Sequence, residues 1–185
     1  MLVQGSAGAV GNAAIQLAVR AGAHVITTIS SDAKAQPARS AGTDEVVDYT
    51  LGNVAERVRT LAPKGIDIVV EVAPAANLAT DLALVKSRGT VAIYANDGGN
   101  QLDLNVAAAI ASNARLQWAM LPATGAAELR VAGNDLTDAV AARAFDVGLE
   151  HGLPLHHFSL DQAAEAHSAV ESGAVGKVML DVSEA

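Results

Sequence analysis

The sequence contains no cysteine, so it has no disulfide framework, no thiolate metal site and no thiol nucleophile. Aromatic residues make up only 3% of it, and Ala, Val, Leu and Ile must therefore fill the interior. No apolar run approaches the length of a membrane span. The first residues also lack the charged region, apolar core and cleavage site of a signal peptide. We therefore expect a cytoplasmic protein.

Positive charge is scarce as well. The chain has 12 Lys and Arg against 20 Asp and Glu, a formal net charge of -8. This balance disfavours nucleic acid and anionic membranes as partners, because both attract Lys and Arg. A local basic cluster remains compatible with binding one cofactor phosphate. The 185 residues suffice for one domain with a substantial core, and their richness in Ala, Val and Gly suits closely packed α/β layers.

Strand and helix signals alternate along the first half of the chain. Short apolar or β-branched runs predict strands at residues 1–3, 25–29, 45–49, 67–72 and 90–94. Segments with helical spacing lie between them, at residues 12–21, 33–41, 54–61 and 78–85. This rhythm predicts parallel strands joined by right-handed crossovers, which is a doubly wound α/β (Rossmann) sheet.

The second half is less regular. Residues 106–111 predict a helix, and the apolar run 116–121 predicts a sixth strand at an edge of the sheet. Residues 126–149 are alanine-rich and helical in tendency, with an expected interruption at Gly133, Asn134 and Asp135. The character of the chain changes near Gly152-Leu153-Pro154.

The turn after the first strand contains glycines at positions 5, 8 and 11. One glycine allows a tight turn, one lets backbone N–H groups approach a pyrophosphate, and one lets helix and strand pack closely. The phosphates would lie at the helix N-terminus, where free N–H groups and the helix dipole favour negative charge. The alternative is a strand-to-helix turn that merely uses small residues.

The end of the second strand bears on the choice of cofactor. A dinucleotide fold that prefers NAD carries an acidic residue there, to accept hydrogen bonds from the ribose 2′-OH. Here the position falls at Ser30 or Ser31, with Lys34 one helical turn further on and Tyr49 at the end of the third strand. This pattern favours NADP, although a shift of two residues would place Asp32 at the diagnostic position. The alternative is that Ser31 and Asp32 cap a helix and that Lys34 lies on a solvated face.

Four histidines in the last third of the chain raise the question of a metal site. His151, His156, His157 and His167 show no helical spacing of four between any two, and no acidic partner stands at ligand spacing. We predict no metal site, and we interpret His167 as a partly buried helix residue.

Three stretches of the sequence carry a family resemblance. They are residues 2–18 around the glycines, residues 65–72, and the tail from Phe158-Ser159-Leu160 through Ala163-Ala164-Glu165-Ala166-His167 to Gly176-Lys177-Val178-Met179-Leu180. They resemble the medium-chain dehydrogenases/reductases, in particular the zeta-crystallin-like quinone oxidoreductase branch. The tail is the more specific signature. The resemblance covers essentially all of this chain but only about the last half of a typical member.

The resemblance implies hydride transfer from NADPH to a quinone or an activated alkene, without zinc. It implies that the pyrophosphate is held by Ala7, Gly8, Ala9 and Val10, and the adenosine 2′-phosphate by Ser30, Lys34 and Tyr49. It implies that the ribose and nicotinamide are lined by Asn77, Ile93, Tyr94, Ala95, Asn96, Met120, Leu121 and Pro122. Ser30 and Ala95 stand where many members have Gly, and Gly173 lies where some members place an Arg for the 2′-phosphate.

The resemblance also divides the chain. Residues 1–152 correspond to the NADP-binding domain. Residues 153–185 correspond to a segment that returns to a GroES-like catalytic domain, which is absent here. We expect this segment to pack atypically, to be poorly ordered or to pair with another copy. Because half of the family's active-site cleft is missing, we assign no catalytic residue.

Two further expectations concern partners. In this family the edge corresponding to residues 116–121 pairs across a two-fold axis, which implies a homodimer with a continuous sheet. The alternative is that the helix at residues 126–149 covers this edge. A second functional reading, from a different class, is a non-catalytic NADP(H)-binding or interaction module.

Overall fold

The computed structural model describes residues 1–182, so the last three residues of the segment 153–185 lie outside the description. It contains a six-stranded parallel sheet in the order β3-β2-β1-β4-β5-β6. The strands are β1 Leu2–Val3, β2 Ile26–Ile29, β3 Glu45–Asp48, β4 Ile66–Glu71, β5 Val85–Ile93 and β6 Arg115–Trp118. The predicted doubly wound sheet is confirmed.

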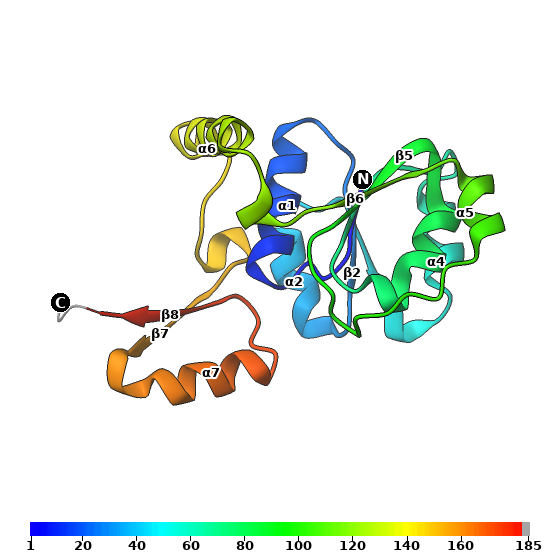
Figure 1. The fold of residues 1–185 in the computed structure, drawn as a ribbon. Helices are drawn as coiled ribbons and strands as arrows, with labels where there is room; N and C mark the ends of the chain where they lie inside the picture. Colours follow the sequence, from blue (N-terminus) through cyan, green and yellow to red (C-terminus); the bar gives the residue numbers. More distant parts are fainter. Residues whose placement is uncertain (183–185) are drawn as a thin grey trace.

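Helices cover both faces of this sheet. The first two, α1 Ala9–Arg20 and α2 Asp32–Ser40, lie on one side, and α4 Pro74–Leu84 and α5 Val106–Ser112 on the other (Figure 1). The helix α3 Val54–Leu61 packs against α4, and α6 Ala126–Ala141 follows the edge strand β6. The described residues also form four short 3-10 helices: η1 Tyr49–Leu51, η2 Leu121–Ala123, η3 Leu149–His151 and η4 Leu160–Gln162.

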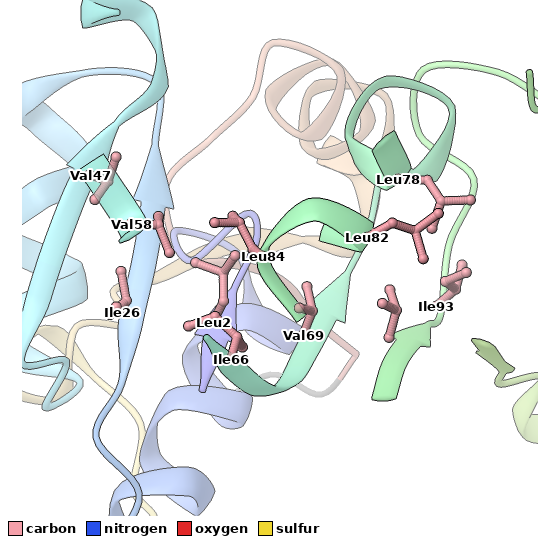
Figure 2. Packing of buried hydrophobic residues seen from close by; sticks show 11 residues of the cluster. Leu2, Ile26, Val47, Val58, Ile66, Val69, Leu78, Leu82, Leu84 and Ile93 are labelled. Carbon is pink, nitrogen blue, oxygen red and sulfur yellow. The ribbon is translucent and has the colours of Figure 1, made fainter. Parts of the chain in front are cut away.

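Each face of the sheet has its own core. Leu2 and Val3 are adjacent in β1 and fully buried, and they point to opposite faces, as successive strand residues do. Leu2 packs with Ile26, Val69 and the residues of α3 and α4 (Figure 2). Val3 packs with Ile15 of α1 on the other face. Aliphatic side chains fill both cores, as the scarcity of aromatic residues requires.

The structure corrects the expected interruption of the helix at residues 133–135. The helix α6 runs unbroken through Gly133 and ends at Ala141, eight residues before the expected end at Leu149. Thr137 Oγ1 donates to the Gly133 carbonyl at 2.9 Å within this helix. The low helix propensity of Gly, Asn and Asp costs at most about 1 kcal/mol per residue, so that neighbouring turns of a 16-residue helix can outweigh it.

The C-terminal part forms a separate small unit. The strands β7 Leu155–Ser159 and β8 Lys177–Asp181 pair in parallel, and α7 Ala163–Glu171 connects them. The strand β8 thus pairs with β7 within the chain. The unit lies beside α2, away from the edge strand β6 (Figure 1). None of the helices within residues 1–182 is both long and apolar enough to cross a membrane.

Candidate functional site

The glycine turn leads from β1 into the N-terminus of α1. Gly5 has φ +73°, a conformation that favours glycine, and it makes the turn. A Cβ on Gly11 would lie 2.7 Å from Ser6 Cα, so Gly11 allows helix and turn to pack closely. A Cβ on Gly8, the N-cap residue of α1, would meet nothing within 4 Å. The first turn of α1 therefore opens onto free space, where its N–H groups favour an anion.

A pocket of about 300 Å³ lies over this turn. It brings together Ala7 and Gly8 of the turn with the predicted residues Ser30, Lys34 and Tyr49. The strand β2 ends at Ile29, so Ser30 follows it directly. Lys34 Nζ donates to Ser30 Oγ at 2.8 Å. The polar end of this pocket is thus a hydroxyl beside an ammonium group.

Asp32, the acidic residue that could have stood at the NAD-diagnostic position after β2, lies elsewhere. Asp32 is exposed in the first turn of α2 and does not line the pocket. The side chain directly after β2 is therefore neutral, which removes the acceptor that a ribose 2′-OH would use.

The C-terminal unit contributes to the same pocket. Gly173 and Ala174 form part of its wall. Gly176 N donates to the Ala7 carbonyl at 3.0 Å, and a bridge joins Gly176 to Gly8. Gly173 thus lies beside Lys34, where the resemblance places an Arg in some members. Lys34 is the basic side chain among the residues lining this pocket.

A second pocket, of about 560 Å³, adjoins the first and shares Gly5, Thr28, Tyr49 and Asp97 with it. Its wall includes the predicted residue Asn77, from the first turns of α4. Sequence reasoning missed Asp97, which lines both pockets. The available signal was its position shortly after β5, at the carboxyl edge where open α/β sheets bind ligands.

The other predicted residues lie outside both pockets. The Ile93 side chain is buried in the core at 2% exposure, whereas Met120 and Leu121 are 69% and 70% exposed on the β6 side. Tyr94 is half-buried, and burial, followed by the nearby Asp97 and Glu71 carboxyls, raises the pKa of its hydroxyl to about 12. The remaining five predicted residues are Ala9 and Val10, which open α1, and Ala95, Asn96 and Pro122, and their roles stay predictions.

Two carboxyl groups lie buried beneath the second pocket, and the sequence reasoning did not identify them. Glu71 ends β4, Asp81 belongs to α4, and both side chains are fully buried. Burial raises the pKa of Asp81 to about 8, with further contributions from its hydrogen bond to Glu71 and the charge of Glu71, while a hydrogen bond from Gln4 opposes the shift. Burial therefore favours the protonated form of Asp81.

Metal ligands do not gather anywhere in residues 1–182, where no group of three or more His, Asp or Glu side chains is placed to hold an ion. Two of the four histidines in the last third of the chain make surface pairs with an aspartate, whereas His167, expected to be partly buried, is exposed on α7. His157 Nδ1 lies 3.0 Å from Asp181 Oδ1, and His151 Nε2 lies 3.7 Å from Asp146 Oδ2.

A third, more apolar pocket of about 610 Å³ lies between α4 and α5. It is larger than the pocket over the glycine turn, but no predicted site residue lines it. The polar and backbone groups that suit a nucleotide converge at the glycine turn, so the candidate site is there.

Known proteins resemble this chain in sequence and in fold. The model of a family described as zinc-binding dehydrogenase matches residues 9–151. A 2-haloacrylate reductase from a Burkholderia species is 29% identical over 174 residues, which cover 90% of this chain and 50% of the relative. The human protein named quinone oxidoreductase is 27% identical over 187 residues, covering 97% and 54%.

Among solved structures, Escherichia coli quinone oxidoreductase complexed with NADPH superposes with a TM-score of 0.83 at 26% identity. The match covers 98% of this chain and 56% of that one. The chain spans about half the length of the relatives it matches.

Proposed function

Because the chain belongs to the zinc-binding dehydrogenase family, we propose that it is the NADP(H)-binding part of a quinone oxidoreductase-like enzyme. One observation carries the choice of cofactor. The pocket at the end of β2 combines a neutral Ser30, the ammonium group of Lys34 and the phenol of Tyr49. A 2′-phosphate needs positive charge and hydroxyl donors, whereas a free 2′-OH needs an acidic acceptor.

The remaining phosphates fit the glycine turn in this proposal. The open N-terminus of α1 at Gly8 holds the pyrophosphate through backbone N–H groups, and Asn77 lies on the side of the ribose and nicotinamide. The bound cofactor supplies the hydride, and the protein binds it, orients it and excludes water. We assign no catalytic side chain. Residues 1–182 hold no ligand set that fits zinc, so no step is derived through a metal.

The proposed acceptor is a small quinone or an activated alkene, in which an electron-poor carbon or oxygen receives the hydride. The names of the human and Burkholderia relatives, a quinone oxidoreductase and a 2-haloacrylate reductase, support this class. We further propose that residues 1–152 form the cofactor domain and that residues 153–185 belong to the family's catalytic domain.

The exposed edge of the sheet supports a homodimer. Trp118 of β6 is 56% exposed, and Met120 and Leu121 beyond it are more exposed still. Both backbone pairing and apolar burial remain available along this edge, so α6 does not cover it as the alternative required. A second copy related by two-fold symmetry would extend the sheet.

Cofactor preference is tested by titrating the chain with NADPH and NADH and following fluorescence. We expect tighter binding of NADPH and, in Lys34→Ala, a loss of about tenfold in NADPH affinity with little change for NADH, because the lost contact joins two charges. Lys64→Ala removes an exposed lysine outside this pocket and is the matched control. NADH binding at least as tightly as NADPH would contradict the assignment to Ser30 and Lys34.

Catalysis is tested separately, by NADPH oxidation with 1,2-naphthoquinone. The Gly8→Asp variant, which places a carboxylate in the open space before α1, is the background control. Turnover above this background supports the oxidoreductase proposal. NADPH binding without turnover would instead support the non-catalytic NADP(H)-binding module.

A further inference from the structure

A continuous chain of polar side chains runs beneath the cofactor crevice. Asn77 Nδ2 donates to Glu71 Oε1 at 3.2 Å, and the backbone N–H of Ala73 donates to the same oxygen. Gln4 Nε2 donates to Asp81 Oδ1 at 3.0 Å, and Thr28 Oγ1 donates to Gln4 Oε1 at 2.5 Å. The chain thus links the β4–α4 turn to the ends of β1 and β2.

The carboxyl groups of Glu71 and Asp81 form the central link of this row of polar side chains. Each has one buried oxygen that no donor reaches, Glu71 Oε2 and Asp81 Oδ2. A hydrogen bond between the two groups is one of the causes that raise the pKa of Asp81. Two ionised carboxylates cannot remain in this position without water, because burial and mutual repulsion both oppose them. A single proton between them satisfies both oxygens and leaves one negative charge on the pair.

We propose that Glu71 and Asp81 share one proton and act together as positioning residues that hold Asn77 and the β4–α4 turn in their cofactor-binding arrangement. The inference rests on the proposed function, since Asn77 lines the crevice assigned to the cofactor. Loss of the proton makes the two carboxylates repel each other. Glu71 Oε1 then moves away from Asn77 and from the N–H of Ala73.

Titratable groups near this pair come from the segment after β5, and α3 carries two arginines. Tyr94 and Asp97, which follow β5, are the nearby titratable groups on the side of Glu71. On α3, Arg57 Nη1 donates to the Asp48 carbonyl, and Arg59 Nη2 donates to the Ala83 carbonyl. Neither guanidinium contacts the carboxyl pair in these hydrogen bonds, and none of the ion pairs within residues 1–182 includes Glu71 or Asp81.

The first test measures the dissociation constant of NADPH between pH 6.5 and 9.5. In the wild type, affinity should fall above pH 8, by up to about tenfold per pH unit, because the binding-competent form holds one proton more. In Asp81→Asn the profile should be flat, since the amide supplies its N–H to Glu71 at every pH and still accepts from Gln4. Asp67→Asn, an exposed carboxylate at the far end of β4, should follow the wild type. A parallel fall in Asp81→Asn would overturn the proposal.

The second test needs no cofactor. At pH 8.5, either single amide variant, Glu71→Gln or Asp81→Asn, should unfold at a higher temperature than the wild type, because the amide supplies the donor that the deprotonated pair lacks. The double variant should unfold at a lower temperature than both, since two NH₂ groups then face each other. Additive effects would contradict a shared proton. If the wild type binds no NADPH at any pH while this cycle remains non-additive, the proposed function fails but the shared proton stands.

Discussion

The sheet region (residues 2–118) and the C-terminal region (residues 126–182) contain similar proportions of apolar residues but bury them very differently. The sheet region holds both core clusters, whereas the C-terminal region buries Ala139, Gly152, Leu153 and Ala166. Val131, Val140, Leu149 and Leu160 of the C-terminal region are each more than half exposed. Its helices and strands form, yet most of its apolar side chains stay exposed. Element formation and burial are therefore separate outcomes in this molecule.

The difference in burial predicts that the sheet region loses more stability than the C-terminal region when an apolar side chain is removed. A matched pair of leucine substitutions gives the largest expected change in the free energy of unfolding. Leu84→Ala removes a side chain that is 3% exposed in the core of the sheet region. The cost should be about 3 kcal/mol, from lost burial plus the cavity left behind. Leu160→Ala removes a side chain that is 60% exposed and should change the free energy of unfolding by less than about 0.5 kcal/mol. Denaturant titration measures both, and equal costs would refute the comparison.

The sequence predicted the sheet region well because its signals are local. Runs such as Val25–Ile29 are apolar and β-branched, and the expected helix at residues 54–61 matches α3 Val54–Leu61. The grouping of Ser30, Lys34 and Tyr49 also follows from topology. Neighbouring parallel strands end at the same edge of a sheet, so residues that follow β2 and β3 come together.

Other features depend on contacts between distant segments and gave little local signal. Glu71 ends an apolar strand and Asp81 lies within an apolar helix, but nothing in either segment shows that the two carboxyls meet. The bond from Gly176 to Ala7 joins nearly opposite ends of the chain. At residues 133–135 the propensity argument failed, because neighbouring helical turns outweigh the local preferences of three residues.

The contact between the two regions can be weakened selectively. Gly176 has φ +106°, and a Cβ there would lie 2.8 Å from Pro154 Cγ. Gly176→Ala should destabilise the C-terminal region locally by about 1–2 kcal/mol. Hydrogen exchange should become faster at Gly176 and along β8 but stay unchanged in β4. Faster exchange throughout β4 would show that the two regions unfold together.

A control separates backbone strain from steric overlap at this contact. Gly173 also has positive φ, at +77°, but a Cβ there would meet nothing within 4 Å. Gly173→Ala therefore carries only the conformational cost, roughly 1 kcal/mol. If it accelerates exchange in β8 as much as Gly176→Ala does, close packing of Gly176 against Pro154 contributes little to the stability of β8.

The smallest expected change in stability comes from removing one N-terminal cap in each region. Ser159 forms a capping box with Gln162, whose Oε1 lies 2.9 Å from Ser159 Oγ and 3.1 Å from Ser159 N. In the sheet region Asn53 Oδ1 accepts from Glu56 N at the start of α3. Replacing either cap by Ala should cost about 0.5–1 kcal/mol.

The two substitutions should differ in whether they destabilise the whole molecule or only one segment. Asn53→Ala should lower the global free energy of unfolding, because α3 packs on the core through Val58. Ser159→Ala should leave the global value unchanged and accelerate exchange only in η4, which Ser159 caps, and at the start of α7, which follows it. This follows because that helix buries Ala166 alone. If Ser159→Ala shifted the denaturation midpoint as much as Asn53→Ala, the C-terminal region would belong to the same cooperative unit as the sheet, despite its exposed side chains.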